Sequence, residues 1–233
     1  STKIVAFNDD STSLLVEVGD LFQKEVSALN GMPGSFRKRY GVKKFDKSRS
    51  YIESVKSYPE NIEVKHVMTY EATKPPGRDQ ANTISMLLNQ SMILLPEDKM
   101  MPRLADYRVG WFTIQKYDYD SDKLKSDNYR ILRRWRLVPK DLEAYKRGEL
   151  VEPVKPIVYY LDPATPKKWR PYFKQGIEDW NVAFEAAGFK NAIIAKEAPS
   201  KEEDPEFSPE DVRYSVVRYV ASDRLFRLEY GEA

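Results

Sequence analysis

The hydrophobic pattern of the first 138 residues is mostly the two-residue alternation of β-strands. The clearest example is NIEVKHVMTY (61–70), where every second side chain falls on one face of an extended chain: Ile62, Val64, His66, Met68 and Tyr70. Glu63, Lys65 and Thr69 fall on the other face. This segment is therefore predicted to be a strand that is packed on one side.

Further strands follow from the same pattern and from the turn residues between them. The predicted strands are residues 3–7, 13–18, 83–95, 111–120 and 129–138. The last two flank the polar SDKLKSDN and are expected to pair with each other. Residues 29–50 are polar and basic, which predicts a long surface loop with at most a short helix. Up to about Val138 the chain is therefore predicted to be an antiparallel β-rich region.

The pattern changes after the charged, proline-bounded segment 139–156, which is a plausible linker. PIVYYL is a continuous apolar run, typical of a strand covered on both faces. A helix is predicted from Pro166 to Ala187, with Thr165 as its N-cap and Gly188 as its left-handed stop. Its apolar residues recur at three- and four-residue steps and are expected to cover a sheet: Trp169, Phe173, Ile177, Trp180, Phe184 and Ala187.

The strand predicted near 192–196 should lie parallel to the one near 157–161, because a helix connects them. A last strand is predicted in RYSVVRYVA. The expected fold class is α+β, with a β-rich accessory domain over residues 1–150. Residues 151–233 are then a strand–helix–strand subdomain.

Composition adds exclusions rather than a function. The chain has 41% hydrophobic and 32% charged residues and a net charge of +2, which argues against a dedicated nucleic-acid binder. No apolar run approaches the ~20 residues that a membrane-spanning helix needs. The absence of cysteine excludes disulfides and thiolate chemistry. Residues 1–10 lack the basic start and apolar core of a signal peptide.

Two constellations have the residue types of a metal site. His66 is the only histidine, and its place on an apolar strand face predicts a hydrogen-bonded core residue. Asp118, Asp120 and Asp122 have the spacing of a calcium loop, but Lys123 and Tyr129 stand where an EF-hand needs glycine and glutamate. A solvated hairpin end is the favoured interpretation of these aspartates, with a weak cation site as the alternative. No catalytic, cofactor-binding or metal-ligating residue is therefore assigned.

Two charged groups have simpler interpretations. Arg130, Arg134 and Arg136 could contact phosphate, but their alternation is typical of a solvated strand face. Glu178 and Asp179 are adjacent and diverge around a helix, so they do not form an acid–base pair.

The segment from PIVYYLDPATPKKWR to NAIIAKEAP resembles the start of the catalytic domain in a bacterial family of zinc-dependent metalloproteases of metzincin type. SYPENIEVKHVMTY, LLPEDKMMPRLADYRVGWFT and RWRLVPKD resemble the region that precedes that domain. The similarity runs from about VEVGDLF to VRYVAS. It implies a parent protein in which zinc activates a water molecule for peptide-bond hydrolysis, with a peptide or protein substrate. It also implies that the helix backs the sheet and braces the active-site helix.

The sequence departs from the family after Ser222. The family continues to an H-E-x-x-H helix and a third histidine, which supply the zinc ligands and the general base. This chain has no matching positions, so it is predicted to be inactive alone, with the rest of the parent polypeptide as its partner. A shortened preparation, a proteolytic piece and a shortened paralogue would each explain the departure. The expected location is the bacterial cell envelope or the exterior. The alternative is a non-catalytic binding or scaffold module derived from the protease fold.

Overall fold

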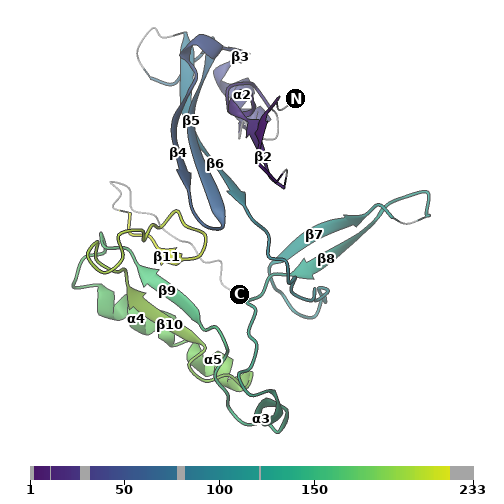
Figure 1. Cartoon of the computed structure of the whole chain (residues 1–233), viewed down its shortest axis with the longest axis vertical. Coiled ribbons are helices and arrows are strands. Elements are labelled where there is room, and N and C mark those ends of the chain that lie inside the picture. The colour runs from purple at the N-terminus through teal and green to yellow at the C-terminus, as the bar shows by residue number, and fades with distance from the viewer. Residues whose placement is uncertain (1–2, 11, 27–31, 78–81, 121, 221–233) are drawn as a thin grey trace. The chain divides into compact units, whose positions relative to one another are not determined.

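The chain forms two compact units, residues 1–95 and 96–233. A computed structural model describes residues 3–10, 12–26, 32–77, 82–120 and 122–220 (Figure 1). Each unit is described by itself below.

The first unit is built around β5 (Asn61–Ala72), which has antiparallel partners on both sides. One side pairs with β6 (Thr83–Ile93) in unbroken register from Asn61↔Ile93 to Glu71↔Thr83. The other side pairs with β4 (Tyr51–Ser57) and, further along, with β3 (Val42–Phe45). Figure 1 shows β4, β5 and β6 as long strands side by side. The strands predicted over 61–70 and 83–95 are thereby confirmed.

The core of this unit lies on the predicted apolar face of β5. Met68 and Tyr70 are buried there with Met32, and Phe36 of α2 (Gly34–Tyr40) packs against them. Of the loop predicted over residues 29–50, residues 29–31 lie outside the described residues, and α2 is the short helix that the prediction allowed. The loop prediction is wrong for residues 42–49, which form β3 and the 3-10 turn η1 (Lys47–Arg49). The few apolar residues of this segment do not recur at a regular spacing, so the sequence pattern did not indicate these elements.

The opposite face of β5 is also partly buried, which the prediction of a strand packed on one side missed. Glu63 is buried and accepts hydrogen bonds from Asn61 Nδ2 at 2.7 Å, Asn89 Nδ2 at 2.6 Å and Ser91 Oγ at 2.7 Å. A buried carboxylate needs such donors, because burial of an ionised group without them costs far more than the roughly 2–7 kcal/mol of a neutral polar group. This face is held by a polar network.

The chain begins with a hairpin, as predicted. β1 (Lys3–Phe7) pairs antiparallel with β2 (Leu14–Glu17), and the short helix α1 (Gly19–Phe22) follows. The side chains of both strands are exposed, whereas Phe22 of α1 is buried.

The second unit opens with another predicted hairpin. β7 (Thr113–Asp118) pairs antiparallel with β8 (Asp127–Leu132), and Leu104 bridges Ile131 on the outer side of β8. A small core then forms around α3 (Leu142–Lys146), where Ala144 packs with Val151, Phe189 and Ala192.

A three-stranded parallel sheet follows, in the order β10-β9-β11. β9 (Ile157–Leu161) lies in the middle, β10 (Ile193–Glu197) pairs with it from Ile193↔Ile157 to Glu197↔Leu161, and β11 (Ser215–Val217) pairs on the other side. The predicted parallel pairing of the strands near 157–161 and 192–196 is confirmed.

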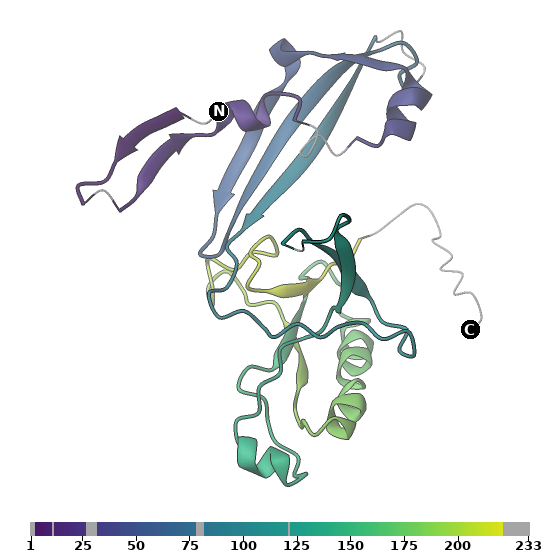
Figure 2. The same ribbon diagram turned by 90° about the vertical axis from the view of Figure 1, so that its right-hand side faces the viewer.

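The predicted helix over 166–187 is present in shortened form. α4 (Arg170–Glu178) and α5 (Asn181–Ala186) are stacked end to end beside the sheet (Figure 2). Asp179 and Trp180 between them keep helical dihedral angles, and the amide of Trp180 bonds the carbonyl of Ile177. Thr165 is not the N-cap, because the carboxylate and carbonyl of Asp162 organise a separate turn there.

The aromatic stripe does not cover the sheet as predicted. Trp180 is 59% exposed and Phe173 is 40% exposed. The half-buried helix positions form a neighbouring face that shares only Ile177 and Phe184 with this stripe: Arg170, Lys174, Ile177, Asn181 and Phe184. The physical reason is that the helices contact the edge of β10, where unpaired backbone groups need polar partners.

Asn181 and Glu178 supply those partners. The side chain of Asn181 accepts from the amides of Ala192 and Ile193 at 3.1 and 3.2 Å and donates to the carbonyl of Ile193 at 2.9 Å. Glu178 accepts from the amide of Ala195 at 3.2 Å. The outer edge of β10 is thus capped by helix side chains.

The end of α5 agrees with the sequence prediction. Gly188 has a φ of 90°, and Phe189 packs into the core beside Phe184. A left-handed residue followed by a hydrophobic contact is a common helix ending.

The described residues are 35% strand and 16% helix, with several small antiparallel sheets, so the predicted α+β class is confirmed. Among them, no helix has the length and apolar character needed to cross a bilayer.

Candidate functional site

A cavity of about 1090 Å³ lies at the carboxyl ends of the three parallel strands. Tyr160 and Asp162 line it from β9 and the residue that follows, Lys196 from β10, and Val216 and Arg218 from β11 and just beyond. Tyr160 is paired with both Lys196 and Val216, so these three side chains share one face of the sheet.

Asp162 joins two of the strand ends. It is 9% exposed, and it accepts from the amide of Ala164 at 2.9 Å and from Arg218 Nε at 2.7 Å. The hydrogen bond from Ala164, aided by Arg218, holds the pKa of this carboxyl below its usual value. Asp162 is therefore a carboxylate at neutral pH that is already occupied by protein donors.

The segment 198–211 forms another wall of the cavity. Phe207 packs against Tyr160 and Tyr214, with ring centroids 5.3 and 4.8 Å away. Asp211 is buried and forms an ion pair with Arg213 at 2.7 Å. The contact between Phe207 and Tyr160 fixes the wall to β9.

His66 is a core residue, as predicted. It is 1% exposed, and its Nδ1 lies 3.1 Å from the carbonyl oxygen of Phe22. A carbonyl only accepts, so Nδ1 carries the proton and Nε2 is the unprotonated nitrogen. Nε2 is buried without a hydrogen-bond partner among the described residues, and burial lowers the pKa of this imidazole. His66 stabilises the contact between β5 and α1.

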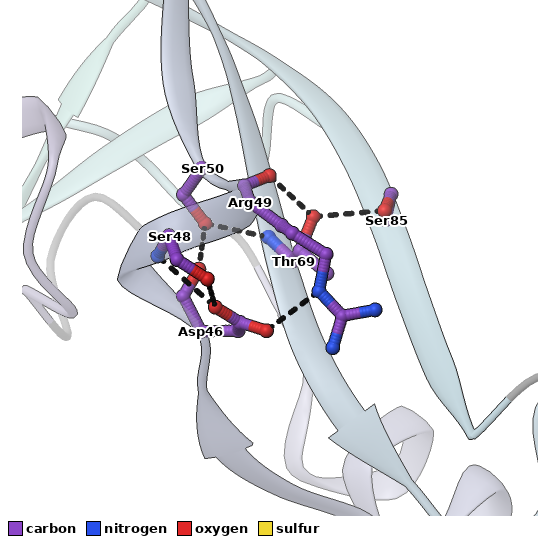
Figure 3. Close-up of polar contacts among 6 residues, drawn as sticks. All are labelled: Asp46, Ser48, Arg49, Ser50, Thr69 and Ser85. Atoms are coloured by element: carbon purple, nitrogen blue, oxygen red, sulfur yellow. Dashed lines mark hydrogen bonds and ion pairs between the residues drawn. The ribbon is translucent and has the colours of Figure 1, made fainter.

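A second polar cluster holds η1 against β5 (Figure 3). The carboxylate of Asp46 accepts from Ser48 N and Oγ and from Arg49 Nε, at 3.0, 2.6 and 2.7 Å. Thr69 donates its amide to Ser50 Oγ at 3.0 Å and its hydroxyl to the carbonyl of Arg49 at 2.8 Å. These bonds join the residues of η1 to one another and to Thr69, so the cluster stabilises the contact between η1 and β5.

The Asp46→Asn substitution should destabilise this turn at neutral pH but not in strong acid. Hydrogen bonds from Ser48, and to a smaller extent from Arg49, lower the pKa of Asp46 to about 2. An aspartate in the unfolded chain has a pKa of about 3.9. The stabilisation is therefore complete above that unfolded value and is lost as the pH falls to about 2. Thermal unfolding can be followed by the NMR signals of residues 42–72. The difference in melting temperature between wild type and variant should become smaller as the pH falls over this range.

The matched control is Glu53→Gln, which removes a charge from an exposed residue of the neighbouring strand β4. A difference for Asp46→Asn that stays constant from neutral pH to the acid limit would contradict the assignment.

The other predicted candidates lie on the β7–β8 hairpin and on α4. Asp118 ends β7, and Asp120 and Asp122 lie in the connection to β8, so these three aspartates are at a hairpin end, as predicted. That it binds no cation stays a prediction.

Of the three arginines, only Arg130 is on strand β8. Arg134 donates to the carbonyl of Met101, and Arg136 forms an ion pair with Asp98. The expectation that all three share a strand face is wrong, because β8 ends at Leu132.

The family model for a domain of unknown function, DUF5117, matches residues 1–140. The chain belongs to the DUF5117 family. None of the curated proteins and none of the solved structures compared with it matches.

The DUF5117 match covers β1 to β8 and ends before α3. All the cavity residues named above follow residue 140, so they lie outside the matched part. The predicted boundary near residue 150 stays a prediction.

Sequence reasoning on this DUF5117 chain missed Asp162, Lys196 and Arg218 as a group. Asp162 follows a predicted strand, Lys196 ends one and Arg218 lies within a third, and this is the one signal that the sequence carried. Only the strand order β10-β9-β11 brings them to the same end of the sheet.

Proposed function

We propose that this chain comprises the accessory region and the first part of the catalytic domain of a zinc-dependent metalloprotease of metzincin type. The observation that carries the proposal is the parallel unit of β9, the α4–α5 helices and β10, in the segment that resembles the start of that domain. The substrate of the complete enzyme is a peptide or protein, and its location is the bacterial cell envelope or the exterior.

The residues of this chain do not fit the zinc ion of such an enzyme. Across the described ranges, no three His, Cys, Asp or Glu side chains are grouped so as to hold a metal. His66 has its Nδ1 occupied by Phe22 and is buried in the core of the first unit. Catalytic zinc usually has three protein ligands and an open position. In this proposal the ligands come from polypeptide beyond these 233 residues, and no catalytic step is assigned to this chain.

The 233-residue chain is expected to retain no stoichiometric zinc after dialysis and to leave casein intact with or without added metal. Atomic absorption and a casein cleavage assay measure the two properties. A longer polypeptide from the same gene that includes an H-E-x-x-H segment should gain both, and should lose cleavage when the glutamate of that segment is replaced. Chelator-sensitive cleavage by the 233-residue chain itself would overturn the proposal.

A non-catalytic binding module is the second candidate, and the cavity at the carboxyl ends of β9, β10 and β11 favours it. The gene distinguishes the two. An H-E-x-x-H codon series downstream of Ala233 favours the protease, and a stop codon directly after it favours the module.

A further inference from the structure

Acidic and basic side chains both line the cavity, but they differ in how many of their hydrogen-bonding groups already have a partner in the protein. Four carboxylates line it, and each already has a partner: Asp162 accepts from Arg218, Glu197 pairs with Arg170, Glu203 accepts from the amide of Ser200, and Asp204 accepts from the amide of Glu206. The acidic groups of the lining are therefore engaged by the protein.

The cationic groups of the lining are engaged much less. Lys196 is exposed, and its ammonium has no hydrogen-bond or ion-pair partner within the described part of the chain. Arg218 uses Nε for Asp162, and its two terminal nitrogens have no acceptor among the described residues. Among the described residues, Lys201 makes only long contacts, at 3.4 Å, with the carbonyls of Pro205 and Phe207. The cavity groups that are left without a protein partner are therefore hydrogen-bond donors.

These donors converge on one place. Lys196, Tyr160 and Val216 are paired across the three strands, and Arg218, two residues beyond Val216, lines the same cavity. Adjacent strands lie about 4.8 Å apart, so long lysine and arginine side chains on β10 and after β11 can reach one ligand over Tyr160.

The position in the topology is also that of a ligand site. The chain leaves β9 to one side to form β10 and then passes to the other side to form β11. In open parallel sheets, ligands bind outside the carboxyl ends of the strands where the strand order changes direction. Here that place is between β9 and β11, where Asp162 and Arg218 lie.

We propose that this cavity binds a small molecule through an oxyanion group, phosphate or carboxylate, held by Lys196 and Arg218. The guanidinium presents its paired N–H groups to two oxygens, and the ammonium adds a point charge. Asp162 orients Arg218 through Nε, and the ring of Tyr160 forms an apolar wall for the body of the ligand. This inference does not depend on the proposed protease function.

The test is an NMR titration of the full chain with sodium phosphate and, separately, with sodium acetate, at constant ionic strength. Saturable shifts are expected for the amides of Ala198, Val216 and Arg218. Saturation by phosphate alone identifies a phosphate ligand, and saturation by acetate alone identifies a carboxylate. Lys196→Ala should weaken binding by about tenfold, the usual size for loss of one charge-assisted hydrogen bond.

The control is Lys155→Ala, which removes the same charge from an exposed residue of the same unit outside the cavity lining. It should leave binding unchanged. Arg218→Gln is the second variant, and its melting temperature is measured because Arg218 also holds Asp162. The proposal is overturned if neither anion saturates, or if Lys155→Ala weakens binding as much as Lys196→Ala. None of these readings depends on proteolysis.

Discussion

Replacement of Asn181 by alanine is expected to lower the free energy of unfolding of the second unit by about 2–4 kcal/mol, since buried backbone groups left without partners cost roughly 1–3 kcal/mol each and do not add fully. The side chain bonds both amides of Ala192 and Ile193 and the carbonyl of Ile193. Ala192 is fully buried, at 0% exposure, so water cannot replace the lost bond without opening the sheet.

Tryptophan fluorescence during urea unfolding is the appropriate measurement. All four tryptophans, at positions 111, 135, 169 and 180, belong to the unit 96–233, so the signal excludes the first unit. Val182→Ala is the control, because Val182 is the neighbouring helix residue and is exposed. Equal unfolding midpoints for Asn181→Ala and Val182→Ala would contradict the capping role.

The second large effect is expected at Gly188. Its φ of 90° is a backbone conformation that is strained for a residue with a side chain. An added Cβ would also lie 2.6 Å from Cε2 of Tyr145. Backbone strain and the steric overlap together should destabilise Gly188→Ala by roughly 2–4 kcal/mol. The hydroxyl of Tyr145 bonds the carbonyl of Ala187, so the ring cannot move away without losing that contact.

Gly176→Ala is the matched control for this prediction. Gly176 lies inside α4, and its added Cβ would meet no atom within 4 Å. This variant should be more stable than the wild type by about 0.5–1 kcal/mol, because alanine is the better helix former. The same fluorescence-detected unfolding reports both variants. A neutral or stabilising Gly188→Ala would show that Tyr145 and the turn adapt.

The sequence predicted elements whose signals are local. The alternation over 61–70, the apolar run before Asp162 and Gly188 after a helical pattern each depend on a few neighbouring residues, and β5, β9 and the end of α5 follow them. The parallel pairing of β9 and β10 was predictable because a helical connection requires it.

Other features depend on contacts between distant residues. The periodicity of Trp169, Phe173 and Trp180 predicts a helix but not which face meets the protein. Asn181 and Glu178 decide that orientation by bonding the edge of β10. For the same reason Thr165 resembled a cap, although the turn at Asp162 occupies that place.

The candidate site was the least predictable part. Lys196 and Arg218 resemble ordinary solvated charges, and nothing near either residue indicates the other. Their place in one cavity depends on β11 adding beside β9 and not beside β10.

Because the edge of β10 is capped, another strand can pair with this sheet only at its other edge, β11. An uncovered strand edge is a template on which other chains aggregate. At β10 the template is occupied by Asn181 and Glu178. At β11, Val217 accepts from the amide of Asp162, so the backbone of Val216 turns the other way, where no described residue bonds it. A strand that is added to this sheet, in a native or a misassembled state, therefore pairs beside β11. A charged residue or a proline at position 216 should block that pairing.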